Sequence, residues 1–338
     1  MKTSEFGSFF RAVGLVFVVL IGASWVWAAR GPMWFLDPEY PMWVAKDEMI
    51  SECRKDATVI IGDSRAVAGL IPARLDPSTV NLALGGATPV ETYYVAQRIL
   101  KCPDLPRKVI LSISPYHFAT ADSYWTRAAL FSFLSFSEME EVRKLSESLN
   151  DRSLYSVSQT GSIEDRLTNF LYASHFPAFY TGSMKAGMVY RRKHTNDEWL
   201  DEVKRQRGYH SFGTDDGSTA LSFEVTAMSG FRSRPIFDAY FDRLLTLFAE
   251  KGIEVNFVPM PMSDLSYKGL PAGFRQDYTA YIDGFRQRHP NFHVTGDLIP
   301  VLPWKYFGDR NHLNRAGAEV WTGTVARTLG INVQVAIQ

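Results

Sequence analysis

Apolar residues along the chain form short continuous runs and longer segments in which they recur every three or four positions. Five short runs rich in β-branched residues predict buried strands at residues 57–62, 78–82, 108–113, 253–258 and 292–295. Helical periodicity predicts helices at 89–100, 237–251, 273–288 and 315–329, with a shorter helix or turn at 66–75. Because strands alternate with helices, we predict an α/β fold with a doubly wound parallel sheet of about five strands.

The alternation stops between residues 118 and 235. This segment has helical stretches, an aromatic stretch at 169–180 and a basic stretch at 191–194. We interpret it as a helical, aromatic-rich insertion over the carboxyl edge of the sheet, which divides the sheet domain into residues 57–117 and 236–338. The aromatic residues suit a core or a platform for sugar rings, and residues 128–136 suit a core or a lipid-facing surface. The basic stretch suits a solvated face or a site for an acidic polysaccharide.

An uncharged apolar stretch, residues 12–29, lies near the N-terminus between Arg11 and Arg30. As a helix rising about 1.5 Å per residue, it approaches the ~30 Å thickness of a bilayer core. We interpret it as an uncleaved transmembrane helix, with a cleaved signal sequence or a buried helix as alternatives. Lys2 and Arg11 precede it, so the positive-inside rule predicts that residues 1–30 are a cytoplasmic stub and anchor. The chain after a membrane-proximal linker at 31–56 is then exoplasmic, either periplasmic or extracellular.

The charge balance argues against a nucleic-acid-binding protein, and the two cysteines bear on the compartment in which the protein folds. The 338 residues include 36 basic and 36 acidic side chains, a balance that does not predict a nucleic-acid-binding surface. Both cysteines, Cys53 and Cys102, precede predicted strands on the oxidising side of the predicted topology. We favour a disulfide between them over two buried thiols, provided that the two strands are neighbours. The histidines show no metal-ligand spacing, so we predict no metal site.

Residues that suit nucleophilic catalysis follow the predicted strands. Ser64 ends the first apolar run, where a strand-to-helix turn can expose its Oγ and direct its N–H at a developing oxyanion. Far along the chain, Asp309 and His312 are close enough to project from one turn, so His312 can act as base and Asp309 can orient it. Gly86 can bring its N–H against a reacting carbonyl, since it has no Cβ. The structural alternatives are helix capping for the serine and the aspartate, and a surface position for the histidine.

Three further polar residues lie near the ends of the predicted strands. Asp63 is expected to hydrogen-bond the turn that contains Ser64. Arg65 suits an anionic substrate group, although we favour a structural ion pair. His117 follows the third predicted strand, at the same edge of the sheet, and is a candidate for substrate contact.

These segments together resemble the SGNH/GDSL hydrolase superfamily over about 57–117 and 236–330. Its blocks I, II and V match Gly62-Asp63-Ser64, the stretch from Asn81 to Gly86, and Asp309-Arg310-Asn311-His312. The resemblance implies that Ser64 is the nucleophile, His312 the base and Asp309 its orienting partner. It also implies oxyanion donors at the N–H groups of Ser64 and Gly86, with Gly85 in the same turn.

Block III departs from the family pattern. Where the family has an asparagine after the third strand, this chain has Ser114-Pro115-Tyr116-His117. The third oxyanion donor is therefore Ser114 or Tyr116, or the two backbone donors suffice. Losing one such donor costs about 10²–10³ in rate, so the departure bears directly on activity.

The anchored, exoplasmic layout resembles one branch of the superfamily, which includes the alginate- and cellulose-type O-acetyltransferases and the teichoic-acid D-alanyl transfer protein. That resemblance implies an O-acyltransferase that modifies a cell-envelope or secreted polysaccharide through an acyl-serine intermediate. The acyl group that it implies is acetyl. It implies a multispanning membrane-bound O-acyltransferase as the partner that supplies the acyl group, and no cofactor. The alternatives are an esterase that acts on the same glycan or on lipid, and a non-catalytic assembly protein.

Overall fold

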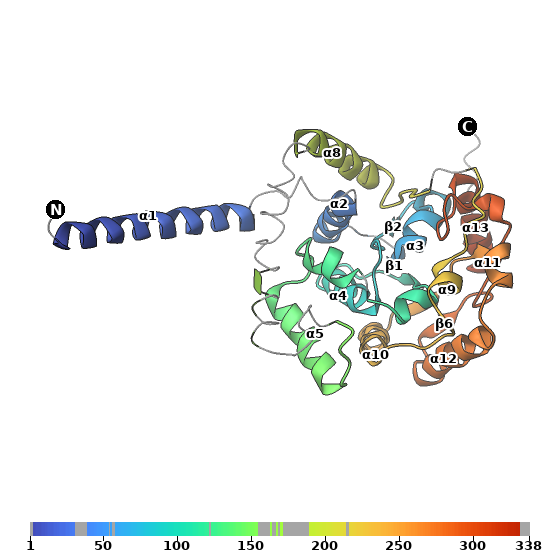
Figure 1. Cartoon of the computed structure of the whole chain (residues 1–338). Helices are drawn as coiled ribbons and strands as arrows, with labels where there is room; N and C mark the ends of the chain where they lie inside the picture. The colour runs from blue at the N-terminus through green and yellow to red at the C-terminus, as the bar shows by residue number, and fades with distance from the viewer. Residues whose placement is uncertain are drawn as a thin grey trace.

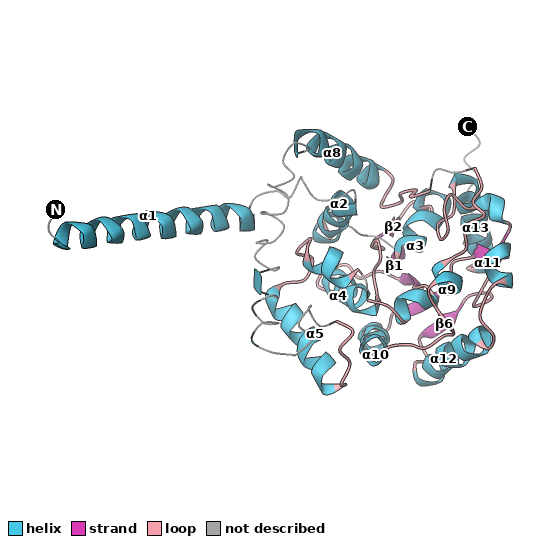
Figure 2. Cartoon of the chain, viewed as in Figure 1, coloured by secondary structure: helices cyan, strands magenta, loops and turns pink. Residues whose placement is uncertain are grey.

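The computed structural model describes residues 3–30, 39–53, 55, 58–121, 123–154, 163, 167, 170–171, 189–213 and 216–331. Helices surround a central sheet of five parallel strands, and one N-terminal helix stands apart from them (Figures 1 and 2). The strands are β1 (Thr58–Gly62), β2 (Thr79–Asn81), β3 (Lys108–Ser112), β4 (Glu254–Phe257) and β6 (Phe292–Val294). Their order, β2-β1-β3-β4-β6, is that of a doubly wound sheet, so the predicted α/β class with a parallel sheet of five strands is confirmed.

Alternate residues of the central strands enter two separate cores, because side chains on a strand point to opposite faces. Ile61 and Leu111 face the core formed with α4 (Pro89–Ile99), α10 (Pro235–Ala249) and α12 (Phe274–Arg288). Ile60 and Ile110 face the core formed with α3 (Ser64–Gly69) and α13 (Arg315–Thr328). The helices predicted from periodicity therefore cover both faces of the sheet.

The end of β1 requires glycine. Gly62 has φ +138°, and a Cβ there would lie 1.7 Å from the carbonyl oxygen of Ser112 in β3. The close approach allows the N–H of Asp63 to donate to that same oxygen at 3.0 Å. The chain then turns directly into α3, whose first residue is Ser64.

The segment expected to be a linker, residues 31–56, instead contributes a helix to the protein. α2 (Glu39–Ser51) has buried residues along its length, and Trp43 packs edge-on against Phe131 and Phe133. Its aromatic residues therefore serve protein packing, and residues 31–38 lie outside the described residues. A second, two-stranded sheet of β5 (Met262–Ser263) and β7 (Val301–Leu302) was also not predicted, since such short strands carry no periodicity.

Between β3 and β4, the described residues contain helices and no strand. Before α10, these are η2 (Pro115–Phe118), η3 (Tyr124–Ala129), α5 (Phe136–Ser148), α8 (Val189–Arg205) and α9 (Phe223–Thr226). Residues 128–136 are mostly core, since Ala128 and Leu134 are fully buried, and a lipid-facing role for them is wrong. Most of the aromatic stretch at 169–180, and the side chains of residues 191–193, lie outside the described residues.

The N-terminal helix α1 (Thr3–Arg30) projects from the rest of the protein (Figure 1). Between Phe6 and Val26 it is long and apolar enough to cross a membrane, by length and composition, and none of this window is buried within the protein.

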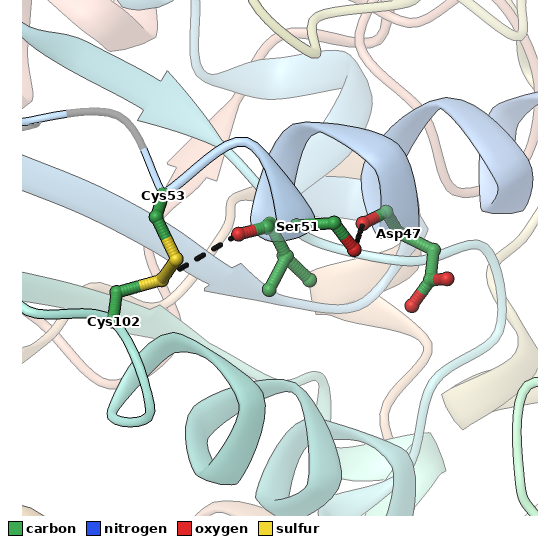
Figure 3. Close-up of a disulfide and its surroundings, with 5 residues drawn as sticks. Asp47, Ser51, Cys53 and Cys102 are labelled. Carbon is green, nitrogen blue, oxygen red and sulfur yellow. Dashed lines mark hydrogen bonds between the residues drawn. A yellow bond between two sulfur atoms is a disulfide. The ribbon is translucent and has the colours of Figure 1, made fainter.

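Cys53 and Cys102 form a disulfide, with their Cα atoms 5.3 Å apart (Figure 3). It joins the end of α2 to the segment after α4, and the two strands that follow the cysteines, β1 and β3, are neighbours as expected. The bridge closes a loop with a sequence separation of 49, for which the chain-entropy argument gives about 4 kcal/mol of stabilisation.

Candidate active site

The structure brings Ser64, His312 and Asp309 into one hydrogen-bonded chain. His312 Nε2 lies 2.8 Å from Ser64 Oγ, and His312 Nδ1 lies 2.7 Å from Asp309 Oδ2. Residues 64 and 312 are 248 positions apart, and meet because β1 and the segment before α13 end at the same edge of the sheet. In this geometry the imidazole can accept the serine proton while the carboxylate holds the opposite ring nitrogen.

Asp309 is held as an anion. Burial raises the pKa of its carboxyl, but the hydrogen bond and charge of His312 and two backbone N–H donors outweigh this and lower the pKa to about 2. The two donors are the N–H groups of Asn311 and His312, both 2.8 Å from Oδ1. One oxygen therefore binds the local turn, which leaves the other free to orient the imidazole.

The N–H groups of Ser64 and Gly86 carry no hydrogen bond to any described residue. Ser64 is half-buried at the start of α3, where Asp63 caps the helix by accepting the N–H of Arg65 at 3.0 Å. Gly86 has φ +71°, a conformation that favours glycine. No described residue accepts a hydrogen bond from either group, and their role as oxyanion donors stays a prediction.

The glycine turn after β2, residues 85–86, is packed closely by side chains from distant elements. A Cβ on Gly85 would lie 2.1 Å from Glu39 Oε2, and a Cβ on Gly86 would lie 2.9 Å from Arg127 Nη1. Glu39 and Arg127 form an ion pair of 2.6 Å, and the hydroxyl of Ser123 donates to the carbonyl of Gly86. The conformation of the turn thus depends on α2 and η3 as well as on its own glycines.

Lys46 of α2 supports the stretch that leads into this turn. Its ammonium is buried and donates to the carbonyls of Asn81 and Gly208. Burial lowers the pKa of Lys46 well below its ordinary value. Asn81 in turn binds two carbonyls of the α3 segment through its side-chain amide, those of Ala66 and Leu70.

Ser114 and His117 converge on Asp63. The N–H of Ser114 donates to Asp63 Oδ2 at 2.7 Å, and His117 Nδ1 lies 2.9 Å from the same oxygen. Burial raises the pKa of Asp63, but the hydrogen bond and charge of His117, with Arg65 and Ser114, lower it to about 2. The backbone N–H of Ser114 is therefore already bonded, and its hydroxyl lies 3.0 Å from His117 Nδ1, so a role for Ser114 as an oxyanion donor stays a prediction.

Tyr116 is buried and stacks on the ring of Phe223, with ring centroids 5.0 Å apart at 25°. The ring of Tyr116 therefore packs against α9, which is distant from it in the sequence. Its predicted role as an oxyanion donor stays a prediction. Phe212 contacts the triad, with its ring centroid 4.8 Å from that of His312.

Arg65 forms the structural ion pair that we favoured. Its Nη2 lies 2.6 Å and 2.7 Å from the two carboxylate oxygens of Glu224, and both side chains are buried. Nothing in the sequence near Glu224 indicated this contact, because the partners are 159 positions apart. Glu39, Arg127 and Phe212 were missed for the same reason.

Within the described part of the chain, no group of three or more His, Cys, Asp or Glu side chains could hold a metal ion. No protein-family model matches the chain, and no curated protein matches it either.

Proposed function

We propose that this protein is a membrane-anchored, exoplasmic O-acyltransferase of the SGNH superfamily that acetylates a cell-envelope or secreted polysaccharide. The observation that carries the proposal is the hydrogen-bonded chain from Ser64 through His312 to Asp309. The unbonded N–H groups of Ser64 and Gly86 beside it support an acyl-transfer reaction, because acyl transfer develops negative charge on a carbonyl oxygen.

The reaction proceeds in two balanced steps. Ser64 Oγ attacks the donor carbonyl while His312 Nε2 takes the serine proton, and the developing oxyanion accepts hydrogen bonds from the two N–H groups. The imidazolium, stabilised by Asp309, returns the proton to the leaving group, which departs and leaves an acyl-serine. A sugar hydroxyl then gives its proton to His312, attacks the acyl carbon and releases Ser64, which regains the proton.

The exoplasmic location is supported by two features of the chain. Lys2 and Arg11 precede the apolar part of α1, which predicts a cytoplasmic N-terminus. The disulfide between Cys53 and Cys102 suits an oxidising compartment. Because acetyl-CoA is cytoplasmic, this location implies that a multispanning membrane-bound O-acyltransferase delivers the acyl group to Ser64.

Two measurements test the proposal. A fluorophosphonate probe should label the purified protein and not its Ser64→Ala variant, while Ser148→Ala, on the surface of α5, should label normally. The ester content of envelope and secreted polysaccharides should then fall in cells that carry Ser64→Ala. A rise in ester content would instead identify an esterase. Absence of labelling, with unchanged ester content and normal protein levels, would identify a non-catalytic assembly protein.

A further inference from the structure

The short helix α9 is fixed to both halves of the candidate active site. Glu224 pairs with Arg65, the residue after Ser64, and this ion pair is buried. Asn311, which lies between Asp309 and His312 in the sequence, has its Oδ1 3.4 Å from the backbone N of Phe223 and 3.4 Å from Arg65 Nη2. The position of Phe223 relative to the triad is therefore set by a buried charge pair rather than by loose surface contact.

Phe223 lies between Tyr116 and Arg310. One ring contact is the stacking on Tyr116, and the other is the guanidinium of Arg310, whose carbon lies 5.1 Å from the ring centroid of Phe223. A cation held against an aromatic ring loses part of its rotamer freedom before any ligand binds. The three residues form an ordered stack that ends at an exposed guanidinium.

Arg310 has no ion-pair partner among the described residues. Arg315, a comparable exposed arginine stacked on a ring, pairs with Glu319 at 3.1 Å. Asp309, the neighbour of Arg310 in the sequence, directs its carboxylate to His312 and to two backbone N–H groups. The positive charge of Arg310, the residue that directly follows Asp309, is therefore not paired with any described carboxylate.

We propose that Arg310 binds an anionic group, a carboxylate or a phosphate, on the carbohydrate whose hydroxyl accepts the acyl group. This inference rests on the proposed function. A guanidinium presents paired donors that match both anions. Arg310 directly follows Asp309 in the sequence, and we expect an anion bound to its guanidinium to orient the acceptor toward Ser64. The acceptor is thus a charged glycan rather than a neutral one.

The test separates the acyl-donor step from acceptor binding. The full-length protein is assayed with 4-nitrophenyl acetate as donor and three acceptors: a hexuronate oligosaccharide, a glycerol phosphate oligomer and a neutral gluco-oligosaccharide. Arg310→Gln should raise KM for a charged acceptor by about tenfold or more, the loss expected for one charge-assisted contact. The same variant should change the rate of 4-nitrophenyl acetate hydrolysis by less than about twofold. Its KM for the neutral acceptor should also change by less than about twofold. Which charged acceptor responds identifies the anion.

Two further variants serve as a graded test and as a control. Phe223→Leu removes the ring beneath Arg310 and should raise KM for the charged acceptor by a smaller factor. Arg275→Gln removes an exposed arginine that is stacked on Tyr267 elsewhere and should have no effect. An equal change for charged and neutral acceptors in Arg310→Gln, or no change for either, would overturn the inference.

Failure of the proposed function would look different. In that case 4-nitrophenyl acetate is not hydrolysed and the phosphonate does not label Ser64. Calorimetric binding of the two charged oligomers to the Ser64→Ala protein then still tests the subsite without turnover. Binding that weakens about tenfold in Ser64→Ala/Arg310→Gln supports the anion subsite. Equal binding by the two proteins, or none by either, refutes it.

Discussion

Glu39, the first residue of α2, forms an ion pair with Arg127 of η3, and both side chains lie against the glycine turn after β2. α2 is the first element described after the apolar helix α1, and its Glu39 lies against Gly85, the neighbour of the predicted oxyanion donor Gly86. The pair is partly buried, with side-chain exposures of 22% and 30%, which limits its screening by solvent. We therefore expect Glu39 and Arg127 to act as positioning residues.

Replacing either member of this pair should reduce kcat rather than substrate affinity. Glu39→Gln or Arg127→Met should lower kcat about 10- to 100-fold with KM within about twofold, because a small displacement of a catalytic donor is costly. The double variant should lose no more than the worse single variant. Arg243→Met, which breaks an exposed ion pair with Glu141, serves as the control. A rise in KM, or fully additive losses, would argue against a positioning role.

Removing the charge of Asp309 should strongly reduce turnover while leaving the fold intact. Asp309→Asn should lower kcat by about 10³–10⁴, because the amide no longer fixes the required tautomer of His312. Since the pKa of Asp309 is lowered to about 2, its carboxylate stays ionised throughout a profile measured from pH 4 to 8. An inflection near pH 4 that is present in the native protein and absent from Asp309→Asn would contradict this assignment.

Asp63 should stabilise the protein in a pH-dependent way. Its pKa falls from the ordinary 3.8 to about 2 on folding, so the carboxylate binds fewer protons in the native state. Its contribution, about 2 kcal/mol, is complete above about pH 4 and is lost as the pH falls towards 2. The free energy of unfolding in urea should therefore differ between native protein and Asp63→Asn at pH 7, with a gap that narrows below pH 4.

The control for Asp63→Asn is Asp283→Asn, which removes an exposed carboxylate paired with Arg286. It should change the free energy of unfolding by no more than about 0.5 kcal/mol. A gap for Asp63→Asn that stays constant from pH 7 to pH 2 would show that the charge of this carboxylate does not carry the effect.

Two glycines with positive φ should respond very differently to alanine. Gly62→Ala places a Cβ 1.7 Å from the carbonyl oxygen of Ser112 and should cost more than about 3 kcal/mol or prevent folding. Gly252→Ala meets no atom within 4 Å, so only backbone strain remains and the loss should be about 1 kcal/mol. Thermal unfolding midpoints of the two variants provide the comparison. Similar midpoints would show that β1 and β3 can separate without cost.

Local sequence pattern predicted most of the fold. All five strands of the central sheet were placed within two residues at either end, because buried parallel strands are continuous apolar runs whose signal does not depend on distant residues. The capping box that begins α4 is also a local feature, because it joins Thr88 and Glu91, three positions apart. The pattern failed for α2, because its first residues belong to a Pro- and Trp-rich stretch, 31–46, that resembles a membrane-proximal segment.

The sequence by itself determined which residue types stand at the ends of the strands, and hence Ser64, Asp309 and His312 as a candidate triad. Only the tertiary structure decided which side chains fix the positions of these three residues and of the turns beside them. Glu224 meets Arg65 across 159 positions, and Glu39 meets Arg127 across 88. Such contacts have no local periodicity, because they depend on how helices from separate parts of the chain pack against one sheet edge. The same packing leaves the side chain of Arg310, the residue after Asp309, exposed and against the ring of Phe223.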